Sequence, residues 1–401
     1  MAVRDIDLMD PTVFSDGIPY DYFRRLRHSD RLPLARDTDG QPFWYLTRHE
    51  DVARVSRDNE TFASGPTTMT SVRKADITDP VITFLDGPAH TRMRKLAFKA
   101  FAPARMALLK KPIRGIVDSL LAEVVEKGEF DLAEDVALRL PFQVLAELLG
   151  VPEPDRDVVI DWARHTVNLG DPEYDLAAGE EDVFDRLLGY FRDLAEARSR
   201  QPADDLFSIL LAARLKSDRI NLPDRLSTEE IAVFATTLIT AGSETTYCSV
   251  SGAVLALLEF GDELAKLRAD RSLMPTAVDE VLRWVTPVTH FARNVVRDTE
   301  IGGQPIGAGE RVVMWYTSAN RDEEVFADPD RFDVTRSPNP HVTFGGGGPH
   351  FCIGNGLAVL ELTQFLDAAI DLLPRMEITG TPVRPESNFM NCVKHLPMRY
   401  R

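Results

Sequence analysis

The strongest constraint on the fold of this chain is a long helix with a clearly marked start. Ser227 and Glu230 have the spacing of a capping box, in which each side chain accepts a hydrogen bond from the backbone N–H of the other residue. Residues 231–241 are apolar or small around the whole circumference, so this stretch is expected to be buried on all sides. The pattern continues to about Phe260, and at about 1.5 Å per residue such a helix is roughly 50 Å long. A buried helix of that length crosses the whole molecule.

The types of element change along the chain. Helix-period apolar patterns, such as that of residues 113–124, dominate the middle, whereas residues 43–46 and 312–315 have the pattern of strands. A last amphipathic helix is predicted at about residues 357–373. The chain is therefore expected to be mainly α with a smaller β portion.

No repeat, low-complexity tract or Gly/Ser linker divides the sequence. This continuity favours a single domain over residues 1–401, with its β portion drawn mainly from residues 30–60 and 287–401. A domain of this size can enclose a fully buried site and a bulky cofactor.

The composition excludes several classes of function. With 46 Lys and Arg against 63 Asp and Glu, the formal net charge is −17, which argues against nucleic acid or an anionic membrane as the main partner. Neither a signal peptide nor a membrane-spanning apolar run is recognisable. Cys248, Cys352 and Cys392 form no Cys-x-x-Cys pair, so neither a disulfide scaffold nor a zinc ribbon is expected and the cytoplasm is the expected location.

The interior of the long helix departs at one point from what a buried helix favours. Gly242 costs about 1 kcal/mol relative to alanine within a helix, and Glu244 brings a charge into an otherwise apolar segment. Local departures of this kind commonly mark functional sites. Residues 241–246 are therefore a candidate site.

A run of four glycines, residues 345–348, precedes Cys352 and the last predicted helix. Glycine allows the backbone to approach a flat or bulky group closely. No Gly-Lys-Ser/Thr follows, so this is not a phosphate-binding loop. A cysteine near a helix N-terminus is favoured as the thiolate, the form that acts as a nucleophile or metal ligand. A buried structural thiol is the alternative for any single cysteine.

Residues 344–354 resemble the haem-binding loop of the cytochrome P450 family, whose usual form is F-x-x-G-x-x-x-C-x-G. Phe344, Gly348, Cys352 and Gly354 match it, although Phe344 lies eight residues before the cysteine where seven is commonest. With its extra glycine, the loop is similar to that of a subgroup of the family that acts on sterols and branched lipids. The resemblance implies the P450 fold, with haem b between the long helix and the helix after the loop, and Cys352 as the proximal iron ligand.

Two more motifs follow the family's order along the chain. Glu280 and Arg283 form an E-x-x-R pair on one helix face, which alone would be read as a solvated salt bridge. Residues 328–332 resemble the family's second arginine-bearing stretch. The resemblance implies that Glu280, Arg283 and Arg331 form a salt-bridge network behind the haem that holds the Cys loop in place.

The candidate site in the long helix is similar to the family's oxygen-activating motif, A-G-x-D/E-T-T. Ala241, Gly242, Glu244 and Thr245 match it. The resemblance implies that Glu244 relays protons and that Thr245 orders the oxygen or its water. The alternative is a threonine bonded to its own helix carbonyl and a glutamate that faces solvent.

Haem also carries two propionates, whose charges need partners once they are buried. The resemblance assigns this role to His90 and Arg94 of an H-x-x-x-R helix, to Arg293 on a strand, and to His350 in the Cys loop. For His90 and Arg94, a solvated amphipathic helix face is the alternative.

The resemblance implies a monooxygenase that inserts one oxygen atom from O2 into an apolar substrate. Electrons would pass from NAD(P)H through ferredoxin reductase and ferredoxin to a monomeric enzyme. Val359 stands where many members have an arginine, which leaves open which ferredoxin docks. A peroxide-driven peroxygenase and a non-catalytic haem protein are the alternatives, and the intact Glu244–Thr245 pair argues against both.

The expected substrate is a steroid, a terpenoid or another lipid-like molecule, because the pocket assigned by the resemblance is apolar. The assigned pocket residues are Phe84, Leu238, Ala241, Val285, Val288, Phe291, Phe389 and Met390.

Overall fold

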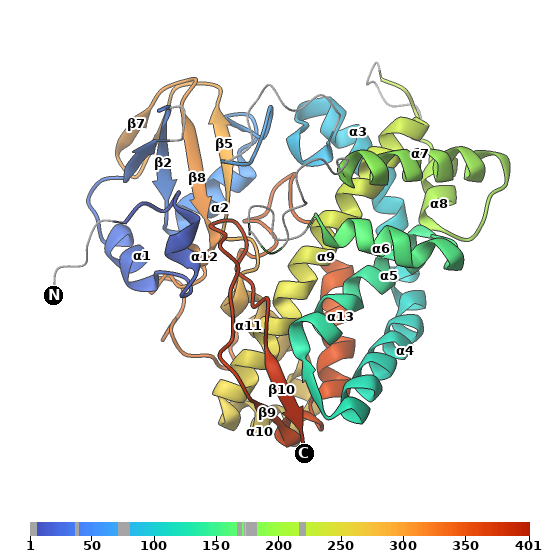
Figure 1. Cartoon of the computed structure of the whole chain (residues 1–401). Helices are drawn as coiled ribbons and strands as arrows, with labels where there is room; N and C mark the ends of the chain where they lie inside the picture. The colour runs from blue at the N-terminus through green and yellow to red at the C-terminus, as the bar shows by residue number, and fades with distance from the viewer. Residues whose placement is uncertain are drawn as a thin grey trace.

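A smaller β region and a larger α region lie beside each other in the computed structural model (Figure 1). The structure describes residues 6–36, 40–70, 81–166, 171, 173, 183–215 and 222–401. The sequence-based prediction of a mainly α fold with a smaller β portion is confirmed.

The helices and strands occupy the following residues. The helices are α1 (Tyr20–Arg27), α2 (His49–Arg57), α3 (Gly87–Ala97), α4 (Pro103–Lys127), α5 (Arg139–Leu149), α6 (Arg156–Arg164), α7 (Val183–Arg200), α8 (Leu206–Ala212), α9 (Thr228–Glu259), α10 (Gly261–Ala269), α11 (Met274–Val285), α12 (Tyr316–Ala319) and α13 (Asn355–Ala369). The strands are β1 (Leu34–Arg36), β2 (Pro42–Leu46), β3 (Phe62–Ala63), β4 (Glu129–Asp131), β5 (His290–Val295), β6 (Thr299–Ile301), β7 (Gln304–Ile306), β8 (Arg311–Trp315), β9 (Met376–Ile378) and β10 (Pro397–Tyr400).

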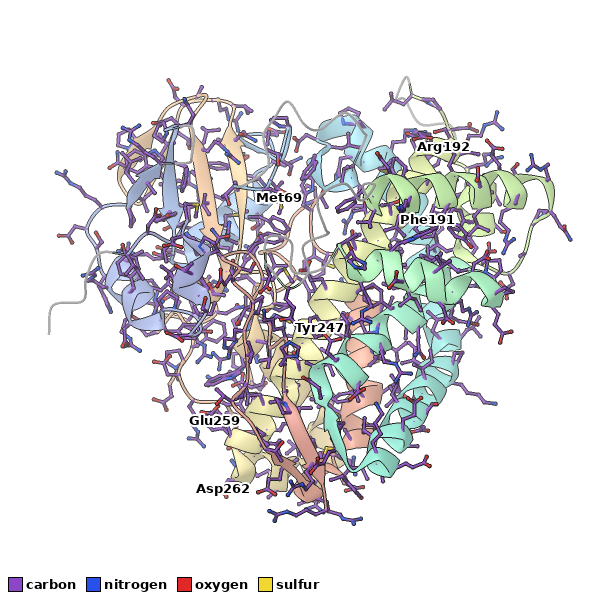
Figure 2. All side chains as sticks on the ribbon, viewed as in Figure 1. Met69, Phe191, Arg192, Tyr247, Glu259 and Asp262 are labelled. Atoms are coloured by element: carbon purple, nitrogen blue, oxygen red, sulfur yellow. The ribbon has the colours of Figure 1, made fainter. Side chains whose placement is uncertain are left out.

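Helix α9 is the long central helix that the sequence predicts. Ser227 caps it, and the reciprocal bonds between Ser227 and Glu230 complete the capping box. The helix has 32 residues and packs against α5, α7, α11 and α13. Figure 2 shows that it runs from the core, where Tyr247 is buried, toward the molecular edge at Glu259.

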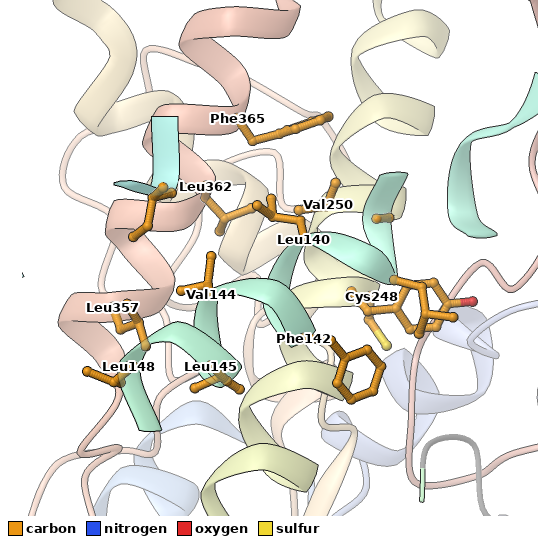
Figure 3. Close-up of a cluster of buried hydrophobic side chains, with 14 of the residues drawn as sticks. Leu140, Phe142, Val144, Leu145, Leu148, Cys248, Val250, Leu357, Leu362 and Phe365 are labelled. Atoms are coloured by element: carbon orange, nitrogen blue, oxygen red, sulfur yellow. The ribbon is translucent and has the colours of Figure 1, made fainter. Parts of the chain in front are cut away.

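Three helices meet in the apolar core that supports α9 (Figure 3). The side chains labelled there come from α5 (Leu140, Phe142, Val144, Leu145 and Leu148), from α9 (Cys248 and Val250) and from α13 (Leu357, Leu362 and Phe365). Burial of one such side chain contributes about 1.5–3 kcal/mol. This packing fixes the position of α9 relative to α13, on which the geometry of the functional site depends.

The β region contains a five-stranded sheet in the order β1-β2-β8-β5-β3. The strands predicted at residues 43–46 and 312–315 are present as β2 and β8, which pair in parallel with Trp44 beside Val312. On β5, alternate side chains face opposite sides of the sheet. Phe291 and Arg293 therefore share one face of this strand, which brings them to the same cavity.

The C-terminal segments add a helix and two strands to the α region. Helix α13, followed by a short 3-10 turn at Leu373–Arg375, corresponds to the helix predicted at residues 357–373. Strand β10 then pairs with both β4 and β9. No helix among the described residues is long and apolar enough to cross a membrane.

Candidate active site

A cavity of about 260 Å³ lies where α9, α13, α3, strand β5 and the Cys loop meet. Its wall includes Cys352 from the loop, Thr245 from α9 and Arg293 from β5. Residues 241 and 245, which lie one turn apart on α9, both face it. The expectation that residues 231–241 are buried on all sides therefore fails along one stripe, because this stripe forms the cavity wall.

Cys352 lies on the wall of this cavity, where its surface is exposed to the cavity space while protein surrounds the residue on its other sides. Its backbone N–H donates to the Phe344 carbonyl at 2.9 Å, which closes the loop. Burial raises the pKa of the thiol, while hydrogen bonds from the Gly354 and Asn355 N–H groups and the charge of Arg94 oppose this shift. The opposing groups are those that stabilise a thiolate at the start of α13.

The glycine run owes its composition partly to another helix of the protein. A Cβ at Gly348, which has φ +80°, would lie 2.3 Å from the Ser56 carbonyl oxygen of α2, and one at Gly346 would lie 2.7 Å from Cα of Ala53. Gly345 and Gly347 line the cavity instead. The expected close approach to a flat group therefore concerns only part of the run, because α2 occupies the space beside the rest.

Two arginines on the cavity wall lack a carboxylate partner among the described residues. Arg293 is only 6% exposed, and its Nη1 donates to the Ala292 carbonyl at 2.9 Å. Arg94 donates to the Phe351 carbonyl of the Cys loop. Burial lowers the pKa of both guanidinium groups, although an arginine remains charged at neutral pH. Asp86 lies near enough to Arg293 to oppose this shift, but no carboxylate among the described residues forms an ion pair with either arginine, so both can bind an added anion.

His90 and His350 stack on each other beside these arginines, with ring centroids 4.0 Å apart. Nε2 of His350 lies 3.1 Å from the Ser64 hydroxyl and 3.5 Å from the Asp86 carboxylate. Burial, with the nearby charges of His350 and Arg94, lowers the pKa of His90 to about 4. His90 can offer a hydrogen bond, and an anion beside it would raise its pKa, so its role as a charge partner of a propionate stays a prediction.

This set of residues fits haem b. The two arginines can neutralise its two propionates, and the two histidines can donate hydrogen bonds to them. The Cys352 thiol on the same wall can ligate its iron. The rest of the cavity wall is largely apolar, as a flat macrocycle requires.

The α9 side of the cavity agrees only partly with the sequence-based expectation. Ala241, Gly242 and Thr245 line the cavity, and the Thr245 hydroxyl donates to the Ala241 carbonyl at 2.9 Å. A Cβ at Gly242 would lie 3.1 Å from Cδ1 of Leu145, so close packing against α5 favours glycine here. Glu244 is not part of the cavity wall that the described residues form.

Glu361 is a candidate that the sequence reasoning missed. It lies on α13, its side chain lines the cavity, and its Oε2 has no hydrogen-bond partner among the described residues. Burial raises the pKa of this carboxyl to about 8. The available signal was a single acid within the apolar face of α13, between the buried residues Leu357 and Leu362.

The network around Glu280 forms as predicted for two of its three residues. Glu280 and Arg283 are completely buried and make two hydrogen bonds of 2.8 Å. Arg336 supplies the second guanidinium, with Nε 3.1 and 3.2 Å from the two carboxylate oxygens. The prediction for Arg331 is wrong, because its side chain is 58% exposed and lies 3.9 Å from Glu263.

The carbonyl of Arg331 still contributes to the network, since it accepts hydrogen bonds from Arg283 and Arg336. The connection to the Cys loop runs through Thr343, whose hydroxyl donates to the Leu282 carbonyl at 2.8 Å. Helix α11 is thereby tied to the residue before Phe344.

The predicted pocket residues divide into two groups. Leu238, Ala241, Val288 and Phe291 are on the cavity wall, whereas Phe84, Val285, Phe389 and Met390 are not.

The structure explains three of these exceptions. Val285 lines a different cavity, which lies further along α9 toward its C-terminal end. Phe389 packs behind Phe291, with ring centroids 5.5 Å apart, and Met390 pairs with Val288 through a β-bridge. The wall residues that the sequence reasoning missed include Leu145, Phe234 and Thr237.

Known proteins resemble the chain over its whole length. A family model described as cytochrome P450 matches residues 176–371. A steroid C26-monooxygenase of Rhodococcus jostii is 36% identical, with 98% of this chain and 84% of the relative covered. A linalool 8-monooxygenase of Pseudomonas putida is 34% identical, with 97% of each covered. A solved structure of a Mycobacterium marinum cytochrome P450 in complex with pseudoionone has a TM-score of 0.88 and 34% identity, with 100% of both chains covered.

Proposed function

Because the chain belongs to the cytochrome P450 family and is a monooxygenase with haem b as its cofactor, we propose that it hydroxylates a terminal methyl group of a branched isoprenoid or lipid, with Cys352 as iron ligand. One observation carries this proposal. The Cys352 thiol and the Thr245 hydroxyl lie on two walls of a single apolar cavity, which also contains the unpaired Arg94 and Arg293.

Cys352 and the basic residues hold the cofactor in this proposal. Haem b, when bound, supplies the iron at which dioxygen is reduced and an oxygen atom is transferred. The Cys352 sulfur binds as the thiolate, supported by the N–H groups at the start of α13. Arg94, Arg293, His90 and His350 bind the propionates as charged or hydrogen-bonding partners.

Helix α9 supplies a hydroxyl group that can hold a proton beside the reacting atoms, and helix α13 carries a protonated carboxyl group on the Cys352 side. Thr245 already donates its proton to the Ala241 carbonyl, so its oxygen can accept a further hydrogen bond. Glu361 is the one carboxyl group of the described residues on the cavity wall, and its raised pKa keeps it protonated at neutral pH. Glu361 belongs to α13, on the Cys352 side of the cofactor, so Glu244 remains the proposed proton donor on the α9 side.

The choice of substrate rests on the cavity wall and on the relatives. Leu238, Val288 and Phe291 provide an apolar surface, which favours a hydrocarbon chain. The printed names of two relatives specify oxidation of steroid carbon 26 and of linalool carbon 8. Both carbons are terminal methyl groups of branched chains, so the same position is proposed for the substrate of this protein.

Electrons are proposed to come from an acidic partner such as a ferredoxin. Exposed basic and apolar residues at the end of α3, in the turn after it and on α4 form the proposed docking patch: Lys95, Phe98, Lys99, Leu108, Lys110 and Lys111. It lies on the side of the molecule where α4 packs against α13, since a Cβ at Gly356 would approach Met106. Gly356 follows Cys352 by four residues, so this patch offers a short route to the thiolate.

The test is turnover of the purified holoprotein with NADH, a ferredoxin, its reductase and O2. We expect a branched terpenoid such as linalool to give a product with one added hydroxyl at a terminal methyl group. Oxygen from 18O-labelled O2 should appear in this hydroxyl. Oxidation that requires added peroxide, or an absence of any product with bound terpenoid, would contradict the proposal.

A further inference from the structure

The cavity wall carries several hydroxyl groups, and those of Thr83 and Thr237 lie among its apolar residues. Thr83 comes from the 3-10 turn Ile82–Phe84, and Thr237 comes from α9. Both line the cavity together with the apolar residues Ile82, Leu145, Phe234, Leu238, Val288 and Phe291. A hydroxyl on such a wall is costly to desolvate unless a ligand or water bonds to it. These two positions are therefore candidates for recognition of a polar group on the substrate.

The two hydroxyls differ in what they can still offer. The Thr237 hydroxyl donates to the Val233 carbonyl at 2.8 Å, so its remaining capacity is that of an acceptor. The Thr83 hydroxyl makes no hydrogen bond to any residue that the structure describes, so it can both donate and accept. A hydroxyl ligand could use both threonines, whereas a ketone, which only accepts, could bond only to Thr83.

The position of Thr237 on α9 sets the distance of this polar group from the reacting carbon. Thr237 lies one helical turn before Ala241 and two turns before Thr245 on the face that lines the cavity. One turn corresponds to about 5.4 Å and two turns to about 11 Å. In linalool, five carbon–carbon bonds separate the hydroxyl-bearing carbon from carbon 8, a span at the lower end of this interval.

We propose that Thr83 and Thr237 select an oxygenated terpenoid, whose alcohol or ketone oxygen lies one to two helical turns from the methyl group that is oxidised. This inference rests on the proposed function and specifies its substrate class. An alcohol donates to Thr237 and accepts from Thr83, and a ketone accepts from Thr83 alone. The spacing favours a compact terpenoid over a molecule whose oxygen lies at the far end of a rigid four-ring body.

The experiment measures the dissociation constants of three ligands for the holoprotein by calorimetric titration. The ligands are linalool, pseudoionone as the ketone, and the hydrocarbon in which hydrogen replaces the hydroxyl of linalool. The variants are Thr83→Val and Thr237→Val, which keep side-chain shape and remove only the hydroxyl. Thr240→Val is the matched control, because this threonine bonds within α9 and is not on the cavity wall.

We expect a distinct pattern across the ligands. Thr237→Val should raise the dissociation constant of linalool roughly three- to tenfold, the effect of losing one neutral hydrogen bond. It should leave the dissociation constant of pseudoionone unchanged. Thr83→Val should raise the dissociation constants of both oxygenated ligands by a similar factor. The hydrocarbon should bind equally to all proteins, and Thr240→Val should match the wild type. Equal loss for all three ligands, or no loss for linalool in either variant, would overturn the inference.

The outcomes for the inference and for the proposed function remain separate. If wild-type holoprotein binds and hydroxylates terpenoids but shows no dependence on the two threonines, only the inference fails. If it binds none of the three ligands, the proposed function fails at its substrate class.

Discussion

The two sides of the cavity are built in opposite ways. On the Cys352 side, polar groups bond across elements: Glu280 of α11 binds Arg336, and Thr343 binds the Leu282 carbonyl. On the α9 side, hydroxyls bond within their own helix, as Thr237 does to Val233 and Thr245 to Ala241.

This difference indicates how rigid each side must be. Bonds between elements define the position of the Cys loop relative to α11, so the loss of one partner should disturb the whole framework. Hydrogen bonds within a helix do not fix the position of α9 relative to a substrate. That position depends on apolar packing, which tolerates substitution better. The cofactor side should therefore be sensitive to single changes, and the substrate side should respond by graded changes of affinity and coupling.

The largest expected effect comes from Cys352→His, which replaces the thiolate that the framework positions. The absorption spectrum of the reduced carbon monoxide complex should change from the thiolate type to the imidazole type, and hydroxylation should fall below detection. Cys392→Ala is the control, since this buried thiol is not on the wall of the active-site cavity. A thiolate spectrum that survives in Cys352→His would show that another group binds the iron.

Glu280→Ala should have the next largest effect, because it leaves Arg283 and Arg336 buried without their carboxylate partner. The expected loss of unfolding free energy is about 3–5 kcal/mol, measured by urea denaturation of the holoprotein. Arg331→Ala is the matched control and should change stability by less than about 0.5 kcal/mol, because its side chain is largely exposed. Equal losses in the two variants would contradict the assignment of Arg336 to the network.

Glu361 should make stability depend on pH. Its pKa is raised from 4.5 to about 8, so between these values the folded protein retains a proton that the unfolded chain releases. Stability should therefore be highest below pH 4.5 as far as this group is concerned and should fall as the pH rises to 8, by up to a few kcal/mol.

Glu361→Gln should remove this part of the pH dependence. The measurement is the urea midpoint at a series of pH values, and Glu259→Gln, at an exposed position of α9, should retain the wild-type slope. A wild-type slope in Glu361→Gln would indicate that the carboxyl is ionised in the folded protein.

The smallest of these effects should come from Thr245→Ala on the α9 side. Haem content should remain normal, while product formed per NADH consumed should fall several-fold and hydrogen peroxide should rise, since proton delivery to bound oxygen loses its control. Thr240→Ala tests whether any lost hydroxyl on this helix has the same effect. Coupling that stays unchanged in Thr245→Ala would assign this hydroxyl to the helix alone.

The sequence was most informative where the relevant interactions are local. The two partners of the capping box lie three positions apart, as do Glu280 and Arg283 on their helix, so these partners can be read from spacing. The Cys loop is likewise a contiguous motif. The choice of Arg336 over Arg331 could not be read in this way, because it depends on how an irregular segment folds back onto α11.

The sequence by itself determined the mainly α fold, the central helix and the resemblance that identified Cys352 as the key residue. Only the tertiary structure decided that Glu361 and Thr237 face the cavity, that Val285 and Met390 do not, and that α2 packs against the glycine run. The physical reason is that helix period and local motifs are encoded over a few residues. A cavity wall, in contrast, is assembled from side chains of many segments, and its composition depends on the packing of those segments against one another.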